Sequence, residues 1–108
     1  MMIEVIYDRR QHRLIVQGHA QSGEPGHDLV CASASILAYS LAASIANAEE
    51  RGTATEVYTF FDKGEAEIRC KPAKKMDGVV RLMYSTICAG YELLSRQYPE
   101  NIRYEVVG

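Results

Sequence analysis

The chain has 108 residues, of which 47% are hydrophobic and 24% are charged. That length suits one domain with one core, and that balance excludes an intrinsically disordered chain. Twelve Lys and Arg stand against 14 Asp and Glu, so the formal net charge is −2. A protein held on RNA or DNA by phosphate contacts normally has a basic surface. We therefore expect one domain over residues 1–108 and no direct nucleic-acid binding.

The N-terminus and the cysteines indicate the compartment. The opening residues, MMIEVIYDRR, lack the pattern of a signal peptide, and we expect no apolar run of bilayer-spanning length. Cys31, Cys70 and Cys88 form no CxxC pair. An odd number of cysteines without a signal is typical of reduced thiols. The sequence therefore predicts a cytoplasmic protein that has no contact with a membrane.

Four segments predict the first two-thirds of the fold. Residues 2–8 alternate apolar and polar side chains, and residues 13–19 do so again after the polar break DRRQH, which predicts a β-hairpin. Residues 29–49 change to apolar steps of three, four or seven, the period of a helix, and are rich in Ala and Ser. Residues 55–70 alternate on both sides of Asp62-Lys63-Gly64, which predicts a second hairpin.

A second helix is predicted over residues 75–98, with Pro99 ending it and a last strand in NIRYEVV. Gly90 is expected at a close packing contact, because glycine costs about 1 kcal/mol in a helix interior. Cys70 and Cys88 are expected in the core. The predicted apolar stripe of this helix is Met76, Val79, Val80, Met83, Ile87 and Leu94.

The order ββαββαβ predicts the fold class. Strands with one wet face need their helices on the other face. We therefore expect an α/β (α+β) fold, a two-layer sandwich in which two helices cover a mainly antiparallel five-stranded sheet.

The stretch QGHAQSGEPGHDLVCASAS, residues 17–35, concentrates the reactive side chains. His19 ends the second predicted strand, and Asp28 is a suitable N-cap for the first helix, which makes Cys31 its third residue. A cysteine attacks only as a thiolate. The helix dipole lowers a thiol pKa by roughly one unit, which is too little, so a neighbouring imidazole is required. His19 is placed to supply it.

Other members of this stretch fit supporting roles. The backbone N–H groups of Cys31 and Ala32 would be unpaired at a helix start and could hold an oxyanion. Ser35 lies one turn after Cys31 on the same helix face, as a hydrogen-bonding or packing residue. Gly18 would allow close approach of substrate or loop backbone. Asp28 serves as the helix cap and could also orient an imidazole.

Three other interpretations of these residues stay open. Cysteine is among the most buried residue types, so Cys31 could simply fill the core. His27 is a rival base, although a strand end holds a base more firmly than a loop does. A metal site is a further alternative without a known zinc spacing, and its ligands would be His19, His27, Asp28 and Cys31. His12, in the first hairpin turn, is expected to be solvated.

The motif GHA at 18–20, a Gly-containing loop, and G-x-D-x-V-C-A-x-x-S at 26–35 resemble the bacterial ribosomal-processing cysteine protease (Prp) family. The twelve-residue spacing of His19 and Cys31 is that of the family signature, and the ββαββαβ order fits over nearly the whole chain. The resemblance implies that Cys31 is the nucleophile and His19 the general base. Gly18, Asp28 and Ser35 match further motif positions. The chain departs at Gln21, where many members have Gly, and His27 adds a titratable group.

The resemblance also implies a function. Members remove a short N-terminal extension from a large-subunit ribosomal protein, cutting after an aromatic segment, and they form homodimers. A Cys–His peptidase needs no metal or organic cofactor, and residues 20–27 would form a lid over the site. The alternative from another class is a non-catalytic module that binds a ribosomal protein or an assembly intermediate.

Overall fold

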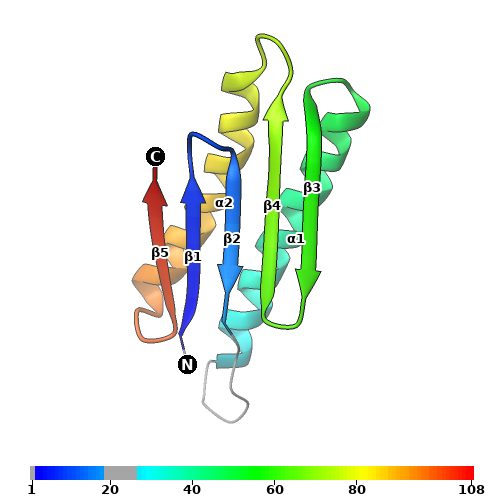
Figure 1. The fold of residues 1–108 in the computed structure, drawn as a ribbon. Coiled ribbons are helices and arrows are strands. Elements are labelled where there is room, and N and C mark those ends of the chain that lie inside the picture. The colour runs from blue at the N-terminus through cyan, green and yellow to red at the C-terminus, as the bar shows by residue number, and fades with distance from the viewer. Residues whose placement is uncertain (1, 19–26) are drawn as a thin grey trace.

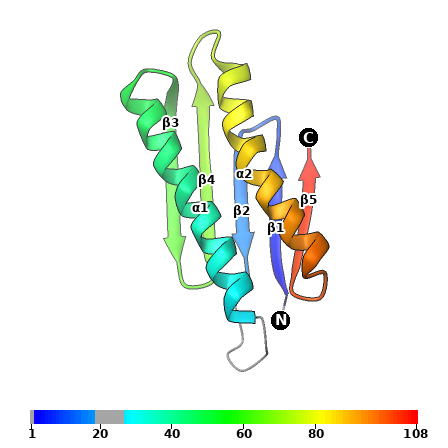
Figure 2. The ribbon, with the colours of Figure 1, turned by 180° about the vertical axis from the view of Figure 1, so that it is seen from behind.

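The computed structural model describes residues 2–18 and 27–108, and the backbone alone for residues 27 and 28. Five strands form one sheet in the order β3-β4-β2-β1-β5. Both helices lie on the same face of this sheet (Figures 1 and 2). In chain order, the elements are β1 (Ile3–Asp8), β2 (Arg13–Gln17), α1 (His27–Glu50), β3 (Ala54–Asp62), β4 (Glu65–Pro72), α2 (Asp77–Gln97) and β5 (Ile102–Val107). The predicted order of elements and the two-layer class are confirmed.

The sheet is mixed but mainly antiparallel. β1 with β2, β2 with β4 and β3 with β4 are antiparallel pairs, and β1 with β5 is parallel. After α2 the chain returns beside β1, so β5 runs in the same direction as β1 (Figure 1). The N-terminal strand is therefore enclosed between two neighbours, and its start is fixed where β2 ends.

The core lies between the sheet and the helices. Small side chains on α1, such as Ala34 and Ala38, let this helix lie close to the sheet. Gly90 of α2 faces α1, because a Cβ atom there would stand 2.8 Å from Cδ2 of Leu37. The packing contact predicted at Gly90 is therefore confirmed. The largest fully buried side chains are Ile3, Val5, Leu14, Val30, Leu41, Ile45, Ile68, Val80, Tyr84, Tyr91 and Ile102.

The buried stripe of α2 differs from the prediction. Its buried residues are Val80, Tyr84, Cys88 and Tyr91, whereas Val79 is exposed. The two tyrosines enter the core because their hydroxyls find acceptors. The Tyr84 hydroxyl donates to the carbonyl of Ile68 at 3.2 Å, and that of Tyr91 donates to the carbonyl of Ala34 at 2.8 Å. The prediction left out aromatic side chains, and it therefore missed Tyr84 and Tyr91 in the buried stripe of α2.

The expectation that no segment could span a bilayer is wrong by length and composition. The most apolar 18-residue window of Leu29–Glu50 has a mean hydropathy of 1.9, so the helix is long and apolar enough for a span, and 28% of that window is buried. In the structure this segment packs on the sheet and provides core residues at regular helical steps.

Candidate active site

Cys31 lies in the second turn of α1, half-buried and packed against the core. It borders a pocket with a volume of about 90 Å³, at the end of the molecule where β2 ends and α1 begins (Figure 1). Ser35 borders the same pocket, one turn further along. The lining residues are Ile3, Val16, Gly18, Cys31, Ala34, Ser35, Ala38, Tyr39, Phe61, Asp62, Gly64, Glu65 and Ala66. The structure thus brings together three residues named from the sequence: Gly18, Cys31 and Ser35.

The start of α1 corrects the predicted N-cap and bears on the predicted oxyanion site. The helix begins at His27, so Asp28 lies within its first turn and is not the N-cap. In the i→i−4 pattern of a helix that begins there, the N–H groups of Cys31 and Ala32 donate to carbonyls of the preceding turn. Their oxyanion role stays a prediction, and in a regular helix of these bounds it would pass to N–H groups nearer the helix start. The N–H groups without a helical acceptor belong to residues 27–29.

Gly18 fixes the other side of the pocket. Its φ is +119°, and a Cβ atom there would stand 2.5 Å from the carbonyl oxygen of Met2 and 2.9 Å from Cα of Ile3. A close approach therefore occurs at Gly18, but by the backbone of Met2 and Ile3, and the predicted approach of substrate or loop backbone stays a prediction. The Gly18 N–H also donates to the carbonyl of Gly64 at 2.9 Å, which fastens the β3–β4 turn to the end of β2.

His19 itself lies outside the described residues, as do Gln21 and most of the 20–27 loop. Strand β2 was predicted to run through His19, but it ends at Gln17 because Gly18 leaves the β region of backbone space. Val16 and Gly18 border the Cys31 pocket. The chain thus enters the segment that holds His19 at the edge of this pocket.

An aromatic pair forms part of the pocket lining. Tyr39 of α1 stacks on Phe61 of β3 with ring centroids 4.5 Å apart. Tyr39 remains 55% exposed. Neither residue was singled out from the sequence, because a pair from two distant elements has no local pattern. Together with Ala34 and Ala38 they make much of the lining apolar, and an apolar side chain of a ligand could occupy such a pocket.

The two other cysteines are confirmed as core residues, each about 3% exposed. Burial raises the pKa of the Cys88 thiol to about 11, and the hydroxyl of Tyr104 partly opposes this rise. Burial also raises the pKa of the Cys70 thiol, partly opposed by the hydroxyl of Tyr84. Both groups are held as protonated thiols at neutral pH, which makes them poor nucleophiles.

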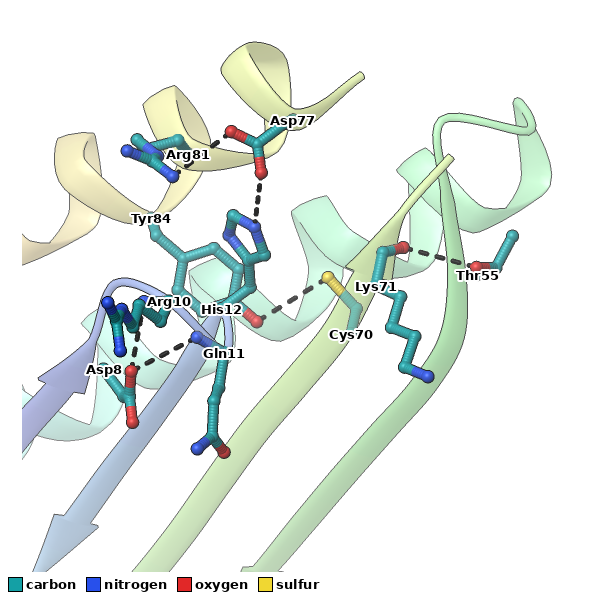
Figure 3. Close-up of polar contacts among 10 residues, drawn as sticks. All are labelled: Asp8, Arg10, Gln11, His12, Thr55, Cys70, Lys71, Asp77, Arg81 and Tyr84. Carbon is teal, nitrogen blue, oxygen red and sulfur yellow. Dashed lines mark hydrogen bonds and ion pairs between the residues drawn. The ribbon is translucent and has the colours of Figure 1, made fainter. Parts of the chain in front are cut away.

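A polar cluster lies at the opposite end of the sheet, around the β1–β2 turn (Figure 3). His12 was expected to be solvated, but it is 4% exposed, and its Nε2 lies 2.9 Å from Oδ1 of Asp77. The carbonyl of His12 accepts the N–H of Cys70 at 3.3 Å. Asp77 also pairs with Arg81 at 3.2 Å. This cluster joins the first turn of the sheet to the start of α2, away from Cys31.

The described residues contain no group of three or more His, Cys, Asp or Glu side chains that could hold a metal ion. His19, one of the four residues of the alternative metal site, lies outside the described residues, and so do the side chains of His27 and Asp28. That alternative stays untested.

The chain is similar to known proteins over nearly its whole length. Residues 2–103 match the model of the family described as cysteine protease Prp. The ribosomal processing cysteine protease Prp of Staphylococcus aureus is 30% identical over 91 residues, which are 83% of this chain and 81% of that protein.

Two solved structures share the fold. One is SMU.848 from Streptococcus mutans, with a TM-score of 0.73, 28% identity, and coverage of 98% of this chain and 94% of the other. The second is the essential ribosomal processing protease Prp from S. aureus with a covalently linked product peptide. Its TM-score is 0.72 at 28% identity, and the match covers 97% of this chain and 99% of that one.

A half-buried cysteine beside a pocket at the start of a helix, on a fold shared with proteases, defines the protein as a cysteine protease. The chain belongs to the cysteine protease Prp family.

Proposed function

We propose that this protease removes a short N-terminal extension from a large-subunit ribosomal protein, cutting after an aromatic segment, in the cytoplasm. The observation that carries the proposal is the position of Cys31 at the edge of an apolar pocket. The S. aureus relative, whose name describes ribosomal processing, supports the substrate class. The pocket between Tyr39 and Phe61 is our candidate site for an aromatic side chain of that segment.

The proposed chemistry uses Cys31 and His19. His19 accepts the proton of the Cys31 thiol, and the thiolate sulfur attacks the carbonyl carbon of the scissile peptide bond. Unpaired N–H groups of residues 27–29 at the start of α1 donate to the oxyanion. The C–N bond then breaks as His19 returns the proton to the leaving amine. Water, deprotonated by His19, hydrolyses the thioester and restores the thiol. Ser35 borders the pocket and supports the site.

The test uses the precursor protein carrying its N-terminal extension, with the mass of each product measured after incubation. The expected result is one cut directly after the aromatic segment. A precursor whose aromatic residues are changed to alanine should be cut at least tenfold more slowly, because the pocket then binds a much smaller side chain. Equal rates of cleavage of the two precursors would contradict the proposed preference for an aromatic segment. Binding of the precursor without any cleavage would favour the non-catalytic module instead.

The proposal includes a homodimer formed through α1. This helix has no charged residue from Leu29 to Ala48, yet Leu29 and Ile36 are 59% and 61% exposed. An uncharged helix face can pack against the same face of a second copy about a two-fold axis. We expect sedimentation to show a dimer that Ile36→Asp converts to a monomer. Leu82→Asp on α2, at a similarly exposed leucine, should leave the dimer intact. A dimeric Ile36→Asp variant would exclude this surface.

A further inference from the structure

Two acidic residues, Asp62 and Glu65, border the Cys31 pocket. Among the described residues that line it there is no Lys or Arg. Within the described part of the chain, neither carboxylate is ion-paired; Asp62 Oδ1 accepts only the N–H of Lys63, at 2.7 Å. Lys63 belongs to the same turn, but it does not line the pocket. Two unneutralised negative charges therefore stand beside an apolar pocket.

The turn that holds these carboxylates is fixed in place. Asp62 and Glu65 are paired residues at the ends of β3 and β4. The carbonyl of Gly64 between them accepts the N–H of Gly18, at the end of β2. Gly18 borders the same pocket as Cys31. The two acidic side chains thus extend from a backbone that is hydrogen-bonded to the edge of the active site.

The pocket at the other end of the sheet has a different balance of positive and negative side chains. Its lining includes the cations Arg10, Arg69 and Lys71, and each of its two acids is ion-paired. Glu56 pairs with Lys71 at 3.3 Å, and Asp77 pairs with His12 and Arg81. Both acids at that pocket are therefore neutralised by neighbouring cations, whereas Asp62 and Glu65 at the Cys31 pocket are not ion-paired.

We propose that Asp62 and Glu65 select substrates in which a lysine or arginine lies close to the apolar side chain that enters the Cys31 pocket. The proposal rests on the proposed protease function and adds a second requirement to the aromatic one. A cationic side chain beside these carboxylates gains attraction at a solvent-exposed site, where each charge pair contributes modestly and is screened by salt. The turn is therefore a specificity element, and it takes no part in bond breaking.

The test compares two peptides with the same aromatic segment, one with lysines in the flanking residues and one with glutamines there. Wild-type protein should cleave the lysine peptide with a kcat/KM roughly fivefold higher at low ionic strength, and salt should reduce this ratio. The double variant Asp62→Asn, Glu65→Gln should cleave both peptides at about the rate of the wild type on the glutamine peptide. The amide side chains keep the shape of the turn.

The matched control is the double variant Glu50→Gln, Glu105→Gln, which makes the same change in net charge at exposed acids outside the pocket. It should keep the wild-type preference. Equal kcat/KM of the wild type for both peptides, or loss of the preference in the control variant, would overturn the proposal.

Failure of the proposed protease function can be distinguished from failure of the proposed selection for lysine. If no protein cleaves either peptide, anisotropy of labelled peptides with the wild type and the double variant decides the matter. Tighter wild-type binding of the lysine peptide, lost in the variant, supports selection by the turn. Equal binding of the two peptides contradicts it.

Discussion

The three cysteines of this molecule have two kinds of surroundings. Cys31 is half-buried beside a pocket, whereas Cys70 and Cys88 are core residues with raised pKa values. The motif around Cys31 distinguished it from the others by sequence alone. The pocket, by contrast, could not be predicted, because its lining comes from α1, the β3–β4 hairpin and the ends of β1 and β2.

This difference predicts selective alkylation. Iodoacetamide at neutral pH should modify Cys31 in the folded protein and leave Cys70 and Cys88 unmodified until the chain is denatured, since burial keeps those two thiols protonated and covered. Peptide mapping by mass spectrometry measures each site. In His19→Ala, the alkylation of Cys31 should shift to higher pH. Coincident pH profiles for the two proteins would mean that His19 does not activate the sulfur.

His12 shows where residue patterns fail. A histidine in a hairpin turn is usually solvated, and only the distant Asp77, 65 positions along the chain, explains its burial. We predict that His12→Ala lowers the free energy of unfolding by about 1–2 kcal/mol through the lost hydrogen bond and packing. Its kcat/KM should be unchanged, because the β1–β2 turn that holds His12 lies at the other end of the sheet from the start of α1, which holds Cys31 (Figure 1). Denaturant unfolding is the measurement.

The control for His12 is Gln11→Ala, an exposed neighbour in the same turn, which should stay within about 0.5 kcal/mol of the wild type. Equal stabilities of the two variants would show that the His12–Asp77 contact adds nothing to the fold.

At the scale of elements, the alternation and helical periods predicted every strand and helix in the correct order, but not the limits of β2 and α1. The end of β2 and the start of α1 both lie next to residues of the motif at 18–35. β2 ends at Gln17 because Gly18 has a positive φ, and only glycine fits there because a Cβ atom would meet backbone atoms of Met2 and Ile3, which lie far away in the sequence. For α1 the sequence predicted Asp28 as the N-cap, but the helix begins at His27, because a residue type that favours the cap also occurs in the first turn of a helix.

Gly18→Ala should therefore be among the most destabilising single changes. It combines a positive φ with a clash against backbone atoms, and we expect a loss of about 3 kcal/mol or more. Gly52→Ala is the matched control, because its φ is +76° but no atom lies within 4 Å of the added Cβ. That variant should lose only about 1 kcal/mol. Chemical denaturation of both variants measures the difference, and similar losses would contradict the close approach.

The buried stripe of α2 predicts alkaline sensitivity. The Cys88 thiol stays protonated in the fold up to a pKa of about 11, whereas the unfolded thiol titrates near the ordinary value of 9.0. The unfolded state therefore loses its proton first, and stability falls as the pH rises through this window. The loss reaches about 3 kcal/mol at the upper end. Cys88→Ala should show a shallower decline between pH 9 and 11, and parallel curves would exclude this contribution.

The whole molecule is elongated, with principal extents of 46 × 23 × 16 Å. The end of β2 and the start of α1 lie at one end of the sheet, and the β1–β2 turn lies at the other (Figure 1). The Cys31 pocket with its unpaired acids is at the first end, and the His12–Asp77 cluster beside cationic side chains is at the second (Figure 3). The net charge of −2 conceals this separation, because it sums over both ends. Composition therefore predicted a single globular domain but could not predict where a charged substrate would bind.

The proposed mechanism requires that Cys31 performs the cleavage. The direct test measures precursor processing by the wild type, Cys31→Ala and Cys70→Ala, with products identified by mass spectrometry. We predict that Cys31→Ala loses at least 10³-fold in rate while still binding the precursor, because the nucleophile is removed and the pocket remains. Cys70→Ala should retain the wild-type rate. Processing by Cys31→Ala at the wild-type rate would contradict the account.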